Sequence, residues 1–288
     1  MKEKNTKNIA ATSLAALRKK KTVSTVYLVL RALVLLTMVA QFFNKNFENV
    51  FLCVLTLILF IMPTILERRL KIDLPDTLEI IILLFIFAAE ILGEIQSFYT
   101  AFPHWDTILH TLNGFLCAAI GFSLVDMLNR SERFSLSLSP VFMAIVAFCF
   151  SMTIGVLWEF FEYAMDRFFL LDMQKDTIVN TISTVTLDPT GGNTPQILED
   201  IAQVIVISGG KEIALDLGGY LDLGLNDTMD DLFVNFVGAV VFSVIGYFYI
   251  KSRGKGRFAR RFIPQVLDAD GDNIPDVLEP LLGNKTDV

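Results

Sequence analysis

Apolar residues gather into six long runs along the 288-residue chain, and polar connections separate them. The runs cover roughly residues 25–43, 49–66, 77–96, 107–128, 139–163 and 231–250. Each comes close to the ~20 residues that an α-helix needs to cross a hydrocarbon layer ~30 Å thick. The pattern predicts an all-α membrane protein, a bundle of six transmembrane helices.

The connection between the fifth and sixth runs, residues 166–229, has a different pattern. TISTVTLD alternates apolar and polar residues, PQILEDIA is typical of a short helix, and VIVIS-GG-KEIALDL predicts a β-hairpin with a Gly-Gly turn. We therefore expect a small α+β extracytoplasmic insertion between the fifth and sixth helices. The sequence leaves open whether it is a lid or binding surface, or only a decorated loop.

Composition supports the membrane assignment, because 53% of the residues are hydrophobic, 19% are charged and the mean hydropathy is +0.55. These values exceed the apolar content of an ordinary soluble domain. We expect the lipid bilayer as a partner and no nucleic acid. The oligomeric state is left open.

The distribution of Lys and Arg predicts the orientation in the plasma (inner) membrane. With six spans, nineteen of the 24 Lys and Arg residues fall in connections on the side of the N-terminus and four on the other side. Cytoplasmic connections carry the excess of positive charge, so both termini of this multi-pass protein are expected in the cytoplasm.

This orientation defines five segments along the chain. They are a basic cytoplasmic arm (1–24), helices one to five (25–165), an acidic extracytoplasmic subdomain (166–229), helix six (230–250) and a cytoplasmic tail, first basic and then acidic (251–288). The arm is expected either as a short helix on anionic lipid or as a flexible terminus.

Ionisable residues inside apolar helices are costly, so their positions carry information. With the predicted orientation, the polar residues of four helices fall in the outer half of the membrane. They are Glu90 and Glu94 in the third helix, Asp106, His110 and Asn113 in the fourth, Glu159 and Glu162 in the fifth, and Asp227, Asp230, Asp231 and Asn235 in the sixth. Within each helix the spacing of three or four residues puts most of them on one face.

Several carboxylates in a medium of low dielectric constant either take up protons or surround a cation. The candidate acid/base residues are Asp106, His110, Glu159, Glu162 and Asp231. The candidate metal ligands are Asp106, His110, Glu159 and Asp231. Oxygen donors with one imidazole suit Mg, Mn, Fe or Zn. N-capping by Asp106 and structural hydrogen bonds of His110 and Glu159 are the alternatives.

Three motifs in these helices, WDTILHTLNGF, LWEFFEYAMD and NDTMDDLFVNFVGA, carry a resemblance. They resemble the YjdF-like family of polytopic bacterial inner-membrane proteins and, more distantly, the VanZ-like proteins. The resemblance implies that the family's polar positions fall on Asp106, His110, Glu159, Glu162, Asp227 and Asp231. Asp230 stands where the family has tryptophan. For the VanZ-like relatives the association is with the cell-envelope response to glycopeptides.

A second candidate metal site lies in the tail, in DADGDNIPDVLE. In the register of a calcium loop the side-chain ligands are Asp268, Asp270, Asp272, Asp276 and Glu279, with the Ile274 carbonyl between them. Gly271 and Asn273 depart from the EF-hand pattern. The alternative is an acidic, flexible tail.

Three functional hypotheses follow from these observations. The first is an intramembrane metal or acid/base site that acts on an envelope or lipid-linked substrate at the outer leaflet. The second is a non-catalytic envelope or assembly protein whose polar groups hold helices together. The third is a transporter, which the sequence favours less because no internal repeat is visible. An enzyme is left undecided, because the cluster lacks a nucleophile and a cation for phosphate.

Overall fold

The computed structural model describes residues 2–70, 72–130, 137–252 and 256–266, so the predicted calcium loop lies outside the described residues. The chain divides into two compact units, residues 1–152 with 235–288, and residues 153–234. The boundaries fall inside two helices that continue without a break from one unit into the other, α7 (Pro140–Phe169) and α8 (Leu225–Lys251).

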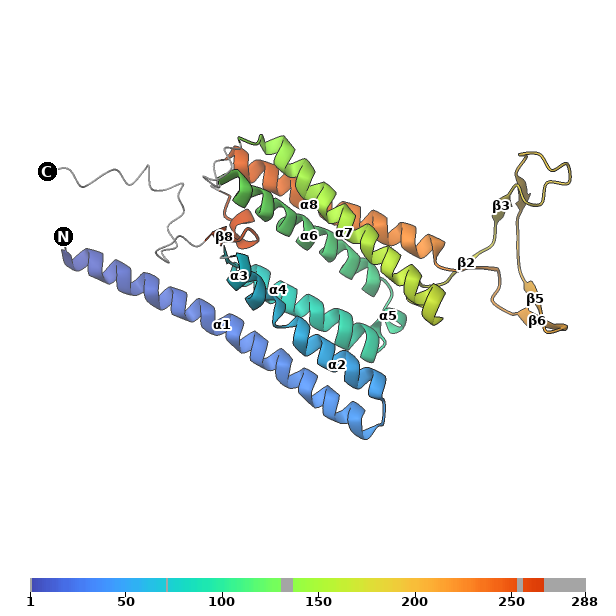
Figure 1. The fold of residues 1–288 in the computed structure, drawn as a ribbon, viewed down its shortest axis with the longest axis horizontal. Coiled ribbons are helices and arrows are strands. Elements are labelled where there is room, and N and C mark those ends of the chain that lie inside the picture. Colours follow the sequence, from blue (N-terminus) through green and yellow to red (C-terminus); the bar gives the residue numbers. More distant parts are fainter. Residues whose placement is uncertain (1, 71, 131–136, 253–255, 267–288) are drawn as a thin grey trace. The chain divides into compact units, whose positions relative to one another are not determined.

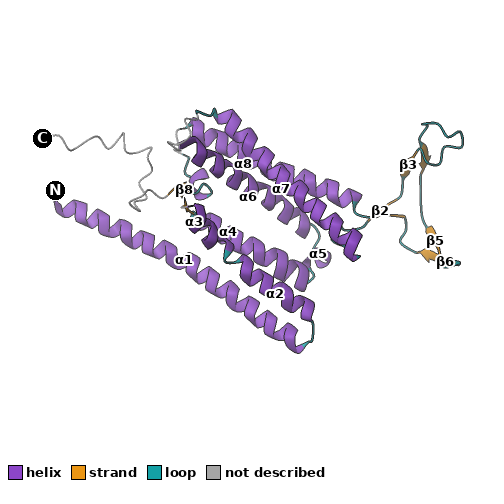
Figure 2. Ribbon diagram, viewed as in Figure 1, coloured by secondary structure: helices purple, strands orange, loops and turns teal. Residues whose placement is uncertain are grey.

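The first unit is mainly helical (Figures 1 and 2). Besides parts of α7 and α8, its helices are α1 (Lys2–Phe43), α2 (Phe47–Leu59), α3 (Met62–Leu70), α4 (Asp76–Phe87), the π-helix η1 (Ala88–Ile95), α5 (Phe98–Ala101), α6 (Trp105–Arg130) and the 3₁₀-helix η2 (Ala259–Arg261). Two short strands, β1 (Ile72–Asp73) and β8 (Gln265–Val266), pair antiparallel.

The second predicted run, 49–66, is interrupted between α2 and α3. Pro63 has no N–H to donate to the carbonyl of Leu59, and its ring crowds that carbonyl. Instead, the backbone ends α2 with a hydrogen bond between residues that are three apart. The Ile61 N–H donates to the Ile58 carbonyl at 3.0 Å. The break therefore has a local cause in the sequence.

Two clusters of buried apolar side chains hold the first unit together. Leu78, Phe122, Met143 and Phe242 belong to the cluster that joins α4, α6, α7 and α8. Leu30, Val34, Cys53, Phe60, Leu83 and Ile91 join α1, α2, α4 and η1 in the other. On α1 the buried residues Val23, Leu30 and Val34 are seven and four residues apart, as expected for a helix that packs along one face.

The second unit contains residues 153–169 of α7, residues 225–234 of α8 and the insertion between them. The strands of the insertion are β2 (Thr177–Val179), β3 (Ile182–Thr184), β4 (Gln196–Leu198), β5 (Val204–Ser208), β6 (Lys211–Leu215) and β7 (Tyr220–Asp222). They form three antiparallel pairs, β2 with β7, β3 with β4 and β5 with β6. The predicted β content of the insertion is thus present.

The hairpin β5–β6 has the predicted turn. Gly209 and Gly210 both have positive φ, 59° and 76°, as a two-residue primed turn requires. The predicted helix in PQILEDIA is wrong. Gln196–Leu198 is strand β4 in register with β3, and Asp200 follows with a φ of 54°. Pairing with a distant strand overrides the local preference for a helix.

Five helices are long and apolar enough to cross a membrane, among the residues that the structure describes. They are Lys21–Phe43, Phe47–Arg69, Trp105–Asn129, Pro140–Phe169 and Leu225–Lys251. The predicted third span, 77–96, is divided between α4 and η1, which follow each other directly. Residues 1–24 were predicted as a separate arm, but from Lys2 onward they continue into the same helix as the first span.

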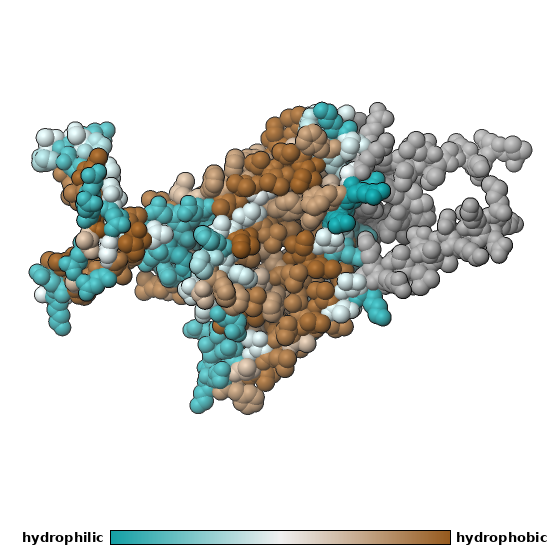
Figure 3. Space-filling model, turned by 180° about the vertical axis from the view of Figure 1, so that it is seen from behind, coloured by the Kyte–Doolittle hydropathy of each residue, from teal (hydrophilic) through white to brown (hydrophobic). Residues whose placement is uncertain are grey.

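The surface of the helices is strongly apolar. Large side chains on several helices are more than half exposed, among them Leu36 at 67%, Phe51 at 66% and Phe160 at 64%. Figure 3 shows hydrophobic residues over much of the helical surface on the face drawn. Such continuous exposure of apolar side chains is unfavourable in water and favourable against lipid tails.

Candidate functional site

One candidate group, in the first unit, lies at the beginning of α6. Asp106 is in the first turn of this helix, and His110 follows one turn later. The Nε2 atom of His110 lies 3.4 Å from Oδ1 of Asp106, and His110 is 7% exposed. The spacing of four residues places both side chains on one face of the helix. The carboxylate therefore orients the imidazole ring through Nε2.

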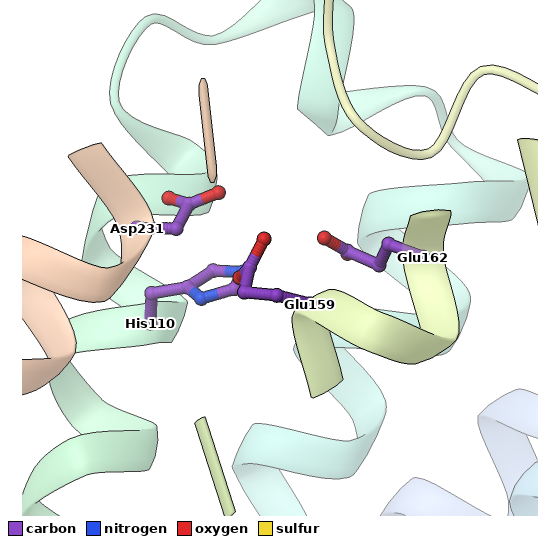
Figure 4. Close-up of side chains that lie close together, drawn as sticks. All are labelled: His110, Glu159, Glu162 and Asp231. Carbon is purple, nitrogen blue, oxygen red and sulfur yellow. The ribbon is translucent and has the colours of Figure 1, made fainter. Parts of the chain in front are cut away.

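A separate candidate group consists of three buried carboxylates in the second unit. Glu159 and Glu162 come from α7 and Asp231 comes from α8, and their exposed fractions are 4%, 7% and 4%. One carboxylate oxygen of each lies within 4.8 Å of the others. Figure 4 shows the three carboxyl groups close together. We call these three residues the carboxylate trio.

Neighbouring residues hold the trio in place. The Trp158 Nε1–H donates to Oε1 of Glu162 at 2.9 Å. Asp227, one turn before Asp231 on α8, accepts a hydrogen bond of 2.6 Å from the Lys175 backbone N–H. Because Lys175 belongs to the segment that follows α7, this bond ties the end of α7 to the beginning of α8.

The same connecting segment is fixed at two further points. Asp166 on α7 accepts hydrogen bonds from the backbone N–H groups of Met173 and Gln174, at 2.6 and 2.8 Å. The Gln174 side chain donates to the hydroxyl of Thr228 on α8. These bonds join the two helices that carry the trio and restrict their separation.

In the first unit, α6 and α8 approach closely at two glycines. A Cβ atom on Gly114 would collide with the backbone oxygen of Asn235, and one on Gly238 would collide with the backbone oxygen of Thr111. Beside these contacts the Asn113 Nδ2 donates to Oδ1 of Asn235 at 3.3 Å. Such small residues let the backbones of membrane helices approach closely.

The third helix of this contact is α7. The Asn235 Nδ2 donates to Sδ of Met152 at 3.6 Å, and the Ser151 hydroxyl donates to the Gly114 carbonyl at 2.7 Å. Asn235 and Ser151 are fully buried. Ser151 and Met152 were not singled out from the sequence, because single Ser and Met residues in an apolar helix give no distinctive signal.

Other polar residues of the predicted outer cluster lie elsewhere. Glu90 is partly buried and Glu94 is exposed, both on η1, and neither joins a group of potential metal ligands among the described residues. Asp230 is exposed on α8.

One buried carboxylate was missed by the sequence prediction. Asp126 lies near the end of α6 and is 6% exposed. It is sixteen residues after His110 in the same helix, or ~24 Å along the axis at ~1.5 Å per residue. Its position in an otherwise apolar run was the available signal. The distance separates it from His110 and Asp106.

The comparisons with known proteins agree with this architecture. A family model described as "Predicted membrane protein (DUF2238)" matches residues 26–252. The chain belongs to this family. The match includes all the residues of both candidate groups.

A relative from Thermotoga maritima, described as "Uncharacterized protein", is 25% identical over 105 residues. The match covers 36% of this chain and 52% of the relative, so the chain spans about half the length of this curated relative. No solved structure matches the chain.

Proposed function

We propose that this member of the family binds a divalent metal ion through the carboxylate trio of α7 and α8, with His110, the ligand predicted from the sequence, as a fourth ligand. The observation that carries the proposal is the convergence of three buried carboxylates within 4.8 Å. At this separation and burial, like charges raise each other's energy steeply unless protons or a cation compensate them. A cation is the better match because a histidine that is already oriented by a carboxylate completes the set.

His110 enters the proposal from the sequence. Its spacing of four residues from Asp106 puts both side chains on one face of α6, and Asp106 lies 3.4 Å from its Nε2.

The donor set fits a metal of hard or borderline character. Three carboxylates with one imidazole suit Mn, Fe or Zn, and no thiolate is present in the set. Asp106 lies at Nε2 of His110, so we assign Nδ1 as the ligating nitrogen and Asp106 as the residue that orients the ring. This assignment changes the predicted role of Asp106 from ligand to orienting residue.

The bound ion would supply Lewis-acid chemistry and a lowered pKa for coordinated water. The Trp158 N–H donates to Oε1 of Glu162 and holds this carboxylate as one of the ligands of the ion. A substrate from the cell envelope, soluble or lipid-linked, would reach the site from the outer leaflet. Support for this location comes from the Lys and Arg distribution, which places the beginning of α6 and the end of α7 on the outer side.

The orientation and the sixth span belong to the same proposal. α4 and η1 together form an unbroken helical segment over residues 76–95, which is long enough to cross the hydrocarbon layer. With six spans both termini lie in the cytoplasm and residues 166–229 lie outside. The proposed location is the plasma membrane.

The decisive experiment is metal analysis of the detergent-purified full chain beside the variants His110→Ala and Glu159→Ala. We expect about one equivalent of a divalent metal in the natural protein and loss of most of it in both variants. Equal, substoichiometric metal in all three proteins, with unchanged thermal stability, would reject the proposal. That result would favour the alternative in which the polar groups only hold helices together, a role for which the Asn113–Asn235 bond is the specific observation.

A further inference from the structure

We propose that the segment after α8, residues 256–266, forms a binding surface for anionic lipid headgroups at the membrane boundary where α8 ends. Only residues of the first unit carry this proposal, which is independent of the metal site. The segment contains η2 and β8 and follows the last apolar run of the sequence. Its packing against the bundle and its exposed basic side chains support a role at the lipid surface.

The segment folds back against the helices of the first unit. The ring of Phe262 lies 5.0 Å from the ring of Phe115 on α6 and 6.4 Å from that of Phe242 on α8, between centroids. Phe262 and Ile263 are buried in the same apolar cluster as Phe242. Phe242 precedes Lys251, the last residue of α8, by nine residues, or ~14 Å along the helix axis. The chain therefore returns toward the middle of α8 after this helix ends.

A short antiparallel ladder attaches the segment to a second span. β8 pairs with β1, which begins three residues after Arg69. Arg69 ends the candidate span Phe47–Arg69, and both Arg68 and Arg69 are exposed in the last turn of α3. The preceding Glu67 accepts a hydrogen bond of 3.0 Å from the Leu74 backbone N–H, so its Oε1 is engaged by the backbone. The ladder holds the segment close to the basic end of this second span.

The exposed side chains of the segment are basic and aromatic. Arg257 and Arg261 are exposed and Phe258 is 54% exposed, whereas Ala259 and Phe262 are buried. The segment thus has an apolar side against the bundle and a basic side away from it. At a membrane boundary, aromatic rings lie at the level of the headgroups, and arginine side chains extend their charged ends toward the phosphates. This division of side chains is typical of an element that lies in the interface.

Charge complementarity selects an anionic partner. A guanidinium group offers parallel N–H donors that match the oxygens of a phosphate. Because Phe262 holds the segment against the bundle, Arg257 and Arg261 stay at the membrane boundary, together with Arg68 and Arg69 of α3. Basic residues at this level attract anionic lipids. A zwitterionic headgroup carries its own positive charge beside the phosphate and is a poorer partner for the same arginines.

The test is titration of the detergent-purified full chain with phosphatidylglycerol, an anionic lipid, and with phosphatidylcholine, which is zwitterionic. Native mass spectrometry gives the dissociation constant of the first lipid bound. We expect the natural protein to bind phosphatidylglycerol more tightly. Arg257→Gln and Arg261→Gln should each weaken this binding by about fivefold, the contribution of one basic residue near an anionic surface. Binding of phosphatidylcholine should stay the same.

Arg167→Gln is the matched control. Arg167 is exposed in the last turn of α7 and belongs to the second unit, so the substitution removes the same charge from another helix end. We expect this variant to bind phosphatidylglycerol like the natural protein. All three variants should unfold at the temperature of the natural protein, because the replaced side chains are exposed.

Inorganic phosphate separates a lipid surface from a site for a soluble anion. An excess of phosphate should leave phosphatidylglycerol bound, and its displacement would assign the arginines to a soluble anion and overturn the proposal. Equal affinity of the natural protein for the two lipids would also overturn it. So would Arg257→Gln and Arg261→Gln variants that bind phosphatidylglycerol as tightly as Arg167→Gln.

Discussion

Nε2 of His110 lies 3.4 Å from Oδ1 of Asp106, one helical turn earlier in α6. Ligating histidines commonly hold a carboxylate on the nitrogen that does not bind metal. We therefore expect Asp106→Ala to lower Mn²⁺ affinity by about 10–100-fold while one binding site per chain remains. Asp76→Ala, in the first turn of α4, is the control and should bind like the natural protein. Loss of the site itself in Asp106→Ala would show that Asp106 is a ligand.

If the carboxylate trio binds a metal ion, the ion should stabilise the protein against unfolding. A ligand at one hundred times its dissociation constant stabilises the native state by about 2.7 kcal/mol. Mn²⁺ at that concentration should raise the unfolding temperature of the natural protein and leave Glu159→Gln unchanged. Glu48→Gln, in the first turn of α2, should keep the full shift. The measurement is thermal unfolding in detergent with and without the ion, and equal shifts in Glu159→Gln and the natural protein would exclude Glu159 as a ligand.

The contact between α6 and α8 predicts a cost for small substitutions. A methyl group at Gly238 meets the backbone of Thr111, which cannot rotate away, so Gly238→Ala should destabilise the protein by about 1–3 kcal/mol. Gly256→Ala is the control, since the nearest atom to its added Cβ is 3.5 Å away, an ordinary contact. The measurement is the thermal unfolding temperature of the two variants, which should be lower for Gly238→Ala. Similar unfolding temperatures would mean that the helices separate at little cost.

We expect the Asp188 carboxylate to make the stability of its loop in the insertion depend on pH. The backbone N–H and then the hydroxyl of Thr190 donate to its carboxylate, and these bonds hold the pKa of Asp188 below its ordinary value of 3.8. A carboxyl group with a lowered native pKa stabilises the loop above its unfolded pKa, and this contribution is lost as the pH falls through the native pKa. Protection of the Thr190 and Thr194 amides from hydrogen exchange, relative to an unstructured peptide, should be constant from about pH 7 to 5 and fall below about pH 4.

A substitution tests the same loop at constant pH. Asp188→Ala should speed exchange of the Thr190 and Thr194 amides about fivefold at pH 6, because each amide loses its acceptor. Glu199→Ala, at an exposed position in the same insertion, should leave both rates unchanged. Identical rates in the two variants would contradict the role of the Asp188 carboxylate.

The proposed orientation predicts which side of the membrane carries the insertion. In a chain freed of Cys53, Cys117 and Cys149, a cysteine at Asn193 should react with an impermeant maleimide added to intact cells. A cysteine at Ser252, just after α8, should react only after the membrane is permeabilised. Labelling of Ser252→Cys alone in intact cells would reverse the orientation and place the metal site at the inner leaflet.

Local sequence was sufficient for features that depend on neighbouring residues. The Gly-Gly turn of β5–β6 could be predicted because two positions of the turn need positive φ. The break after α2 follows from Pro63, which has no backbone N–H to donate. The helix predicted for PQILEDIA failed for the opposite reason. Its residues pair with β3, which lies at the other end of a loop, and no local pattern reveals that partner.

The candidate site shows the same division. The sequence by itself determined the apolar helices and the faces on which Asp106 with His110 and Glu159 with Glu162 lie, because helical spacing is a property of each segment alone. Only the tertiary structure decided that Asp231 meets the two glutamates and that Asp126 is buried. Which helices approach, and in which register, depends on contacts such as Gly238 on Thr111 and Asn113 on Asn235. These contacts join residues more than one hundred positions apart, so the pattern of a single helix cannot specify them.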